Sequence, residues 1–218
     1  MTTSDLPDAA VVAVSARYRR GFADLVSPLD AAQLAAPSLC AGWDVRTVAG
    51  HLVSALTTTV PSFLVQVLRA RGNVDRAVDR AARRDAARPV AEMVAVLRER
   101  ADSSFAPPGI GARGPMTDAI VHTADVTVPL GLPFDPDPGD VRIALDFVVG
   151  TVPLAFTTRR RLAGLRFVAD DSGFARGEGA EVRGRGVDVL LAACGRPAVL
   201  DRLTGDGVAT LAARLTGR

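Results

Sequence analysis

The sequence predicts an α+β protein, with a helical domain over residues 1–162 followed by a small α/β domain over residues 163–218. In the first part, apolar residues recur at steps of three and four, which is the periodicity of an amphipathic helix. After Gly164, apolar residues alternate with others, as they do in a half-buried strand. Proline and glycine residues punctuate both parts and set the expected ends of the elements.

Five helical segments are expected in the first domain. Asp8 can cap the first segment, which continues to Val26. Asp44 can cap the second, whose single apolar stripe runs to about Arg69 and includes His51. The other three are expected over residues 89–105, 115–128 and 138–156, the last with a kink at Pro153. A short helical turn is expected over residues 29–34, and the polar residues 72–88 are a connection or an exposed helical segment.

The second domain is expected to contain two strands and three short helices. The strands are placed at residues 165–169 and 181–183, with a turn over residues 170–173. Helical periodicity then returns over residues 187–193, 197–203 and 208–215, separated by glycines.

Arginine supplies every basic side chain of this 218-residue chain, which has 26 basic and 24 acidic residues and a net charge of +2. The excess of arginine, alanine and valine is typical of a GC-rich coding sequence, so the arginines do not by themselves indicate a nucleic-acid partner. The basic clusters at residues 19–20, 83–84 and 159–161 are scattered and form no stripe that could follow a phosphate backbone. Nucleic-acid binding is therefore not expected.

The chain lacks the motifs of several enzyme classes. It has no Gly-x-Ser-x-Gly elbow and no His-Glu-x-x-His zinc motif, and a P-loop needs a lysine. Cys40 and Cys194 match no metal-binding spacing, so both are expected to be reduced thiols. No apolar run reaches the roughly 18 residues of a membrane span, and the first residues carry no basic leader. The expected location is the cytoplasm.

Histidine is scarce, since the chain has only His51 and His122. On a helix, Asp118, His122 and Asp125 fall within an arc of about 60°, so a carboxylate and an imidazole face the same point one turn apart. That arrangement suits a metal ion, but it is also common on a solvated helix face. His51 lies at the edge of an apolar stripe, where a core histidine is the usual explanation. If the bundle joins the two helices, His51, Asp118 and His122 form a two-histidine, one-carboxylate set with open coordination positions.

Three runs of the chain resemble the mycothiol-dependent maleylpyruvate isomerase family of the DinB-like superfamily. In the first, residues 34–52, a Gly42-Trp43 corner precedes a helix with a His-Leu pair. The second, residues 116–133, is similar to the family's second metal-ligand helix. The third, residues 184–207, resembles its sterol-carrier-like C-terminal module. The resemblance implies a DinB-like four-helix bundle followed by a small α/β domain.

The resemblance also implies a chemistry. It implies that His51, Asp118 and His122 coordinate a divalent metal, typically zinc, although the same ligand set also takes nickel or iron. The metal would stabilise the thiolate of mycothiol, which attacks a small electrophilic substrate and leads to isomerisation or S-transfer. Asp125 would orient a ligating histidine, and Arg196 would hold a substrate carboxylate through a bidentate contact. Mycothiol would in turn fit a GC-rich actinobacterial host.

One departure from the family pattern favours a second hypothesis. The family often has glutamate where Asp118 stands, and aspartate is one methylene shorter, so its carboxylate reaches less far. The chain would then be a non-catalytic module that encloses a small apolar ligand, with a structural metal or none. Arg196 equally fits a surface arginine that caps or bridges neighbouring groups.

Overall fold

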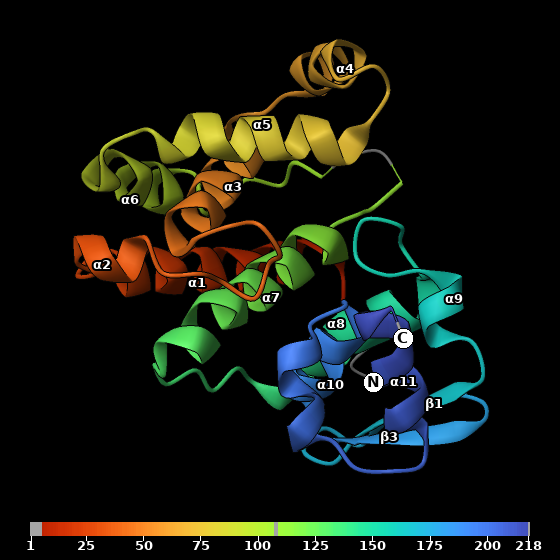
Figure 1. Ribbon diagram of the computed structural model, residues 1–218. Coiled ribbons are helices and arrows are strands. Elements are labelled where there is room, and N and C mark those ends of the chain that lie inside the picture. Colours follow the sequence, from red (N-terminus) through yellow and green to blue (C-terminus); the bar gives the residue numbers. More distant parts are fainter. Residues whose placement is uncertain (1–5, 107–108, 218) are drawn as a thin grey trace. The chain divides into compact units, whose positions relative to one another are not determined.

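The computed structural model describes residues 6–106 and 109–217 (Figure 1). Close packing divides the chain into two compact units. One comprises Asp8–Phe134, and the other comprises the described residues from Asp135 onward, together with the two described residues before Asp8.

The first unit is a helical bundle. Its helices are α1 (Asp8–Val26), α2 (Ala31–Leu34), α3 (Val45–Thr57), α4 (Val60–Arg69), α5 (Val74–Ala86), α6 (Val90–Glu99) and α7 (Arg113–Leu130). Four of them form the bundle itself, because α1 and α3 each pack against both α6 and α7. Its core contains fully buried apolar side chains, among them Phe22, Val48, Met93, Leu97 and Ile120. The prediction of a helical N-terminal bundle is confirmed.

The prediction of one helix from Asp44 to Arg69 is wrong, because the chain forms two helices, α3 and α4, in this stretch. Thr59 is extended, and its hydroxyl accepts a hydrogen bond from the backbone N–H of Ser62. The Ser62 side chain accepts one from the Thr59 backbone, which completes a capping box. Pro61 suits the first turn of the new helix. The apolar periodicity continues across this break, so periodicity alone does not reveal it.

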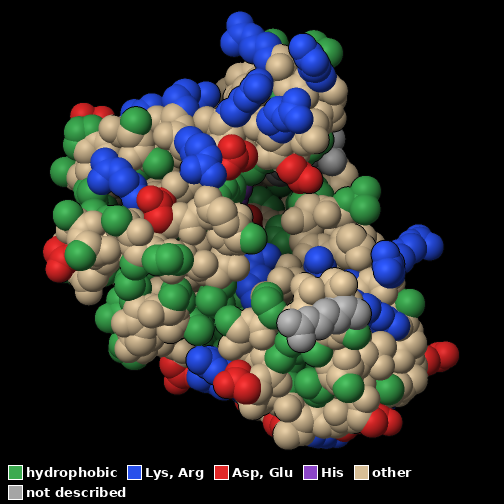
Figure 2. All heavy atoms as spheres, viewed as in Figure 1, with side chains coloured by type: hydrophobic (Ala, Val, Ile, Leu, Met, Phe, Trp, Pro, Cys, Tyr) green, Lys and Arg blue, Asp and Glu red, His purple; other side chains and the backbone are tan. Residues whose placement is uncertain are grey.

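Helix α4 buries none of its side chains. Four of its apolar side chains are between 40% and 76% exposed, namely Val60, Leu64, Val65 and Leu68, and Phe63 and Val67 are half-buried. Arginine side chains gather on the surface over α4 and α5 (Figure 2). Helix α4 packs against α5 and contributes no side chain to the core.

Helix α5 packs closely against α3, although residues 72–88 were expected to be a connection or an exposed segment. Its buried side is formed mainly by alanines, namely Ala77, Ala81, Ala82 and Ala86. The closest approach is at Gly50 of α3, where a Cβ atom would lie 2.3 Å from the carbonyl oxygen of Ala82. Alanines set among arginines and aspartates give a weak apolar signal, which is why the sequence pattern did not indicate this interface.

The second unit combines a three-stranded sheet with helices. Its elements are α8 (Pro138–Thr151), α9 (Arg159–Leu162), β1 (Leu165–Ala169), β2 (Phe174–Gly177), β3 (Ala180–Gly184), α10 (Gly186–Ala193), the 3-10 helix η2 (Pro197–Arg202) and α11 (Gly207–Thr216). The strand order is β2-β1-β3, with β1 antiparallel to β2 and parallel to β3. Helix α8 packs against α10 and β2. This unit therefore begins before residues 162/163, where the change of sequence texture placed the domain boundary.

The expected small α/β unit is confirmed in outline and differs in detail. It has a third strand, β2, which the sequence pattern did not indicate because only Phe174 of its four residues is buried. Helix α8 ends at Thr151 instead of bending at Pro153, since Val152 adopts a left-handed conformation with φ of 50°. Helix α6 ends at Glu99, earlier than expected. No helix among the described residues is both long and apolar enough to span a membrane.

Candidate metal centre

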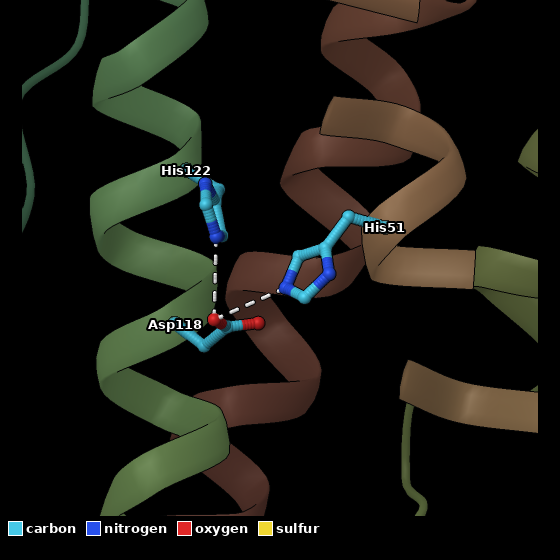
Figure 3. A group of neighbouring side chains, drawn as sticks. All are labelled: His51, Asp118 and His122. Atoms are coloured by element: carbon cyan, nitrogen blue, oxygen red, sulfur yellow. Dashed lines mark hydrogen bonds and ion pairs between the residues drawn. The ribbon is translucent and has the colours of Figure 1, made fainter. Parts of the chain in front are cut away.

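Two helices of the first unit bring His51, Asp118 and His122 together (Figure 3). Helix α3 carries His51, and α7 carries Asp118 and His122 one turn apart. The start of α3 is fixed by Asp44, whose carboxylate accepts a hydrogen bond from the backbone N–H of Thr47 at 2.7 Å. Helix α7 packs against α3, and the three side chains point toward one another from these two helices.

One carboxylate oxygen faces both imidazoles. Asp118 Oδ1 lies 3.4 Å from His51 Nε2 and 3.3 Å from His122 Nε2. Ligand atoms around a tetrahedral zinc ion, with bonds of about 2.0–2.1 Å, are about 3.3 Å apart. The donors are therefore of the right kind for a divalent ion, and the two distances from Asp118 match that spacing, so the shorter side chain of Asp118 reaches both histidines. Among the described residues, this is the one group of three potential ligands whose donor atoms all lie within 4.8 Å of one another.

The centre is largely buried, and Asp118 is its most exposed residue. The side chains of His51 and His122 are 14% and 8% exposed, whereas that of Asp118 is 22% exposed. Burial disfavours the charged form of Asp118, but the charges of His51 and His122 and their hydrogen bonds hold the pKa of Asp118 well below its usual range. Asp118 thus stays ionised near neutral pH, as the ligand of a divalent cation must be.

Asp125 faces the other nitrogen of His122. Its side chain is fully buried, and its Oδ2 lies 2.9 Å from His122 Nδ1. An aspartate placed there keeps the imidazole proton on Nδ1 and leaves Nε2 with the lone pair that a metal needs. This is the geometry that the predicted orienting role of Asp125 requires.

Arg196, which was predicted to hold a substrate carboxylate, lies in the second unit between α10 and η2. Its Nη1 donates a hydrogen bond to the carbonyl oxygen of Cys194 at 2.8 Å. A role of Arg196 in substrate binding stays a prediction. Cys194 is buried and Cys40 is half-buried, and neither forms a disulfide.

Two residues beside the centre, Trp43 and Arg19, had no role there in the sequence-based prediction. The indole of Trp43 contacts the rings of both His51 and His122. Arg19 of α1 is 5% exposed, donates to two backbone carbonyl oxygens after α6 at 2.7 and 2.8 Å, and interacts electrostatically with Asp118. Arg19 occupies the buried stripe of α1, so its position among apolar residues was a usable signal. The contacts of Trp43 depend on how its loop folds onto α3, which periodicity does not encode.

The pKa of His122 predicts how the metal-free protein responds to pH. Burial disfavours the imidazolium, but the charge of Asp118 and hydrogen bonds to Asp118 and Asp125 outweigh burial and raise the pKa of His122 from 6.5 to about 9. The contribution of protonated His122 to the free energy of unfolding is fully present below pH 6.5 and is lost as the pH rises through 9. Urea denaturation of the metal-free protein should show the free energy of unfolding falling by up to about 3 kcal/mol across that window.

The same proton competes with a metal ion. Because a cation needs the neutral Nε2 of His122, apparent metal affinity should rise by about tenfold per pH unit below pH 9. The control is Asp118→Asn, which removes the charge that raises the pKa of His122. If the free energy of unfolding of Asp118→Asn falls with pH as it does in the wild type, the titrating group is not His122.

The N-terminal part of the chain matches a known family. Residues 15–109 match the family model of the mycothiol maleylpyruvate isomerase N-terminal domain. That segment includes His51 and most of the bundle, whereas α7 with Asp118 and His122 follows it. A comparison with curated proteins found no match.

Two solved structures resemble the chain over nearly its whole length. A crystal structure of a histidine-to-alanine mutant of the mycothiol-dependent maleylpyruvate isomerase matches with a TM-score of 0.62 and 14% sequence identity. A crystal structure of the mycothiol-dependent maleylpyruvate isomerase matches with a TM-score of 0.54 and 15% identity. Both matches cover 94% of this chain and 95% of the other. Residues 15–109 thus match the model of the mycothiol maleylpyruvate isomerase N-terminal domain, and the chain has the fold of the mycothiol-dependent maleylpyruvate isomerase.

Proposed function

We propose that this protein is a metal-dependent enzyme that uses mycothiol to attack a small electrophilic substrate. The observation that carries the proposal is the convergence of His51, Asp118 and His122, because this triad contains every histidine of the chain. The family model that residues 15–109 match and the fold of the chain support the choice of mycothiol as the thiol. Zinc is the proposed metal, and nickel or iron suits the same ligands.

Three protein ligands leave coordination positions for a further ligand. A divalent ion bound there would stabilise the thiolate form of a low-molecular-weight thiol at neutral pH. His51 and His122 supply neutral nitrogens, and Asp118 supplies the one negative charge of the set. Asp125 keeps the proton of His122 on Nδ1, so that Nε2 is available at neutral pH once a cation replaces the proton.

The chemistry of the thiolate allows two outcomes. Addition of the sulfur to an activated double bond turns that bond into a single bond, and rotation followed by expulsion of the thiolate gives the isomer. If the attacked carbon carries a leaving group, the leaving group departs with the electron pair and the product keeps the sulfur. Arg196 is proposed to hold a substrate carboxylate in either case. The cytoplasm of an actinobacterium is the proposed setting, since it fits both mycothiol and the arginine-only composition.

Metal analysis combined with a thiol-dependent assay tests this function. We expect about one divalent ion per chain in the wild type, and its loss from His51→Ala and His122→Ala with circular dichroism unchanged, because an open functional site is not needed for folding. Maleylpyruvate is the first substrate to test, followed by other small electrophiles. Mycothiol should be required for turnover, and both variants should fall to the uncatalysed rate.

The alternative function is a non-catalytic module that binds a small molecule. It would be favoured if the variants lose both the metal and their circular dichroism signal, because the metal would then be structural. A fully metal-loaded protein that shows no mycothiol-dependent turnover over a broad panel of electrophiles would overturn the enzymatic proposal.

A further inference from the structure

The two histidines of the centre differ in what holds their second nitrogen. His122 Nδ1 is paired with the buried carboxylate of Asp125 at 2.9 Å. His51 Nδ1 is buried and has no hydrogen-bond partner among the described residues. Histidines that bind metals nearly always donate this N–H to an acceptor, which fixes the rotation of the ring. His51 therefore needs another means of orientation.

The ring of Trp43 is placed to provide it. The centroids of the Trp43 and His51 rings are 5.1 Å apart with an interplanar angle of 43°, and Trp43 also stacks on His122 at 6.0 Å and 29°. The two imidazoles are 4.7 Å apart and nearly perpendicular. A rotation of His51 about its side-chain bonds would have to displace one of these two rings.

Trp43 is itself held firmly. Its indole Nε1 donates a hydrogen bond to Asp79 Oδ1 of α5 at 2.9 Å. Arg83, one turn further along α5, donates to both oxygens of Asp79 at 2.9 and 3.1 Å and to the carbonyl oxygen of Gly42 at 2.9 Å. The backbone is fixed as well, because Trp43 N–H donates to the Cys40 carbonyl at 3.0 Å. The loop before α3 is thus bound to α5 by two contacts, one through the Trp43 indole and one through the Gly42 carbonyl.

We propose that Trp43, anchored by Asp79, is a positioning residue that sets the ring orientation of His51. The indole fixes the orientation of the His51 ring by packing against it, whereas Asp125 fixes the orientation of the His122 ring by a hydrogen bond. It also covers one side of the two imidazoles with an apolar surface, which strengthens electrostatic interactions at the centre. The inference rests on the metal site of the proposed function, but the positioning of His51 can be tested with and without metal.

Two pairs of variants separate packing from anchoring. Trp43→Leu removes the ring contact, whereas Trp43→Phe keeps an aromatic ring and loses the hydrogen bond to Asp79. Asp79→Leu removes the acceptor of the indole N–H, whereas Asp79→Asn keeps an oxygen acceptor. Asp75→Leu is the matched control, because Asp75 lies one turn earlier on α5 and is exposed.

The first measurement needs no metal. Since the chain has two histidines, long-range proton–nitrogen NMR spectra contain only two sets of imidazole signals. In Trp43→Leu we expect the His51 signals to broaden through ring motion while those of His122, held by Asp125, stay sharp. Trp43→Phe should restore sharp His51 signals in part. Asp79→Leu should broaden them, and Asp79→Asn and Asp75→Leu should not.

The second measurement uses Co²⁺, whose absorption spectrum reports the geometry of its ligands. Trp43→Leu should bind Co²⁺ about 10–100-fold more weakly and with an altered spectrum, which is the usual effect of losing an outer partner of a ligand. Asp75→Leu should match the wild type. The proposal is overturned if Trp43→Leu keeps sharp His51 signals, or if it binds Co²⁺ with the wild-type spectrum and affinity.

The two proposals fail in different ways. If the wild type binds no Co²⁺, the metal-dependent function fails, and the NMR spectra still decide whether Trp43 orients His51. If the wild type binds Co²⁺ and all variants bind it equally, the metal site stands and the role of Trp43 is wrong. If Trp43→Leu loses its circular dichroism signal, it is unfolded and cannot be used. The His51 NMR signals and the Co²⁺ binding of Trp43→Phe and Asp79→Leu then decide whether Trp43 orients His51.

Discussion

Replacing Gly50 with alanine is expected to destabilise the protein by about 3 kcal/mol, at the upper end of the cost of overpacking a core. The added Cβ atom would lie 2.3 Å from the carbonyl oxygen of Ala82, 2.5 Å from the amide nitrogen of Ala86 and 2.9 Å from its Cα. All three atoms belong to the backbone of α5, so no side chain can rotate away. Helices α3 and α5 must separate instead, which moves His51. Chemical denaturation should show the loss of stability, and Co²⁺ affinity should fall with it.

Gly21→Ala is the matched control. Gly21 lies in α1, and a Cβ atom there would meet nothing within 4 Å. The same substitution should therefore stabilise the protein by about 0.5–1 kcal/mol, because alanine loses less backbone entropy in a helix. A Gly50→Ala protein as stable as the wild type would show that α3 and α5 do not touch as described.

Asp118→Asn is expected to have the largest effect on metal binding. The amide is nearly the same size as the carboxylate, but it removes the negative charge that faces both Nε2 atoms at 3.3 and 3.4 Å. Metal affinity should fall by more than the roughly 10–100-fold that follows the loss of an outer partner. The pKa of His122 should also fall from about 9, because the charge of Asp118 is the main cause that raises it.

Asp125→Asn is the variant with which the metal affinity of Asp118→Asn is compared. It changes the residue behind His122 without removing a ligand, so its effect should stay within about 10–100-fold. Asp118→Glu restores the charge with one more methylene and should bind metal. Competition with a chelator gives the affinities, and NMR titration of the two histidines gives the pKa values. If Asp118→Asn binds metal as tightly as Asp125→Asn does, Asp118 is not a metal ligand.

The helices of the bundle could be predicted where apolar periodicity and caps agree. Helix α1 has the periodicity, and it ends at Val26 as predicted, although Asp8 is its first helical residue and not a cap outside it. The break at Thr59 was missed because the apolar stripe continues through both helices. The capping box of Thr59 and Ser62 starts a new helix without interrupting that stripe. Helix α5 was only half predicted, because its packing depends on alanines meeting Gly50, and small residues produce almost no periodic signal. Strand β2 was missed because three of its four residues are exposed.

The candidate ligands could be named from the sequence because histidine is so scarce. The spacing of Asp118 and His122 placed them on one helix face, and the structure brings His51 of α3 to them. The surroundings of the ligands were not predictable in the same way. Trp43 and Asp79 meet only because a loop folds against α5, and this contact spans 36 residues of sequence. Such contacts arise from tertiary packing, which no local pattern records.

Helix α4 has a consequence for how the protein can change over evolution. It contributes no buried side chain, so its local opening is energetically separate from the unfolding of the core. Helices α3 and α5, which it connects, remain fastened to each other by their own close packing. The exposed positions of α4 can therefore accept substitutions without disturbing His51, whereas Ala70, which follows the helix, is 1% exposed. A substitution at one of these exposed positions should change the free energy of unfolding little.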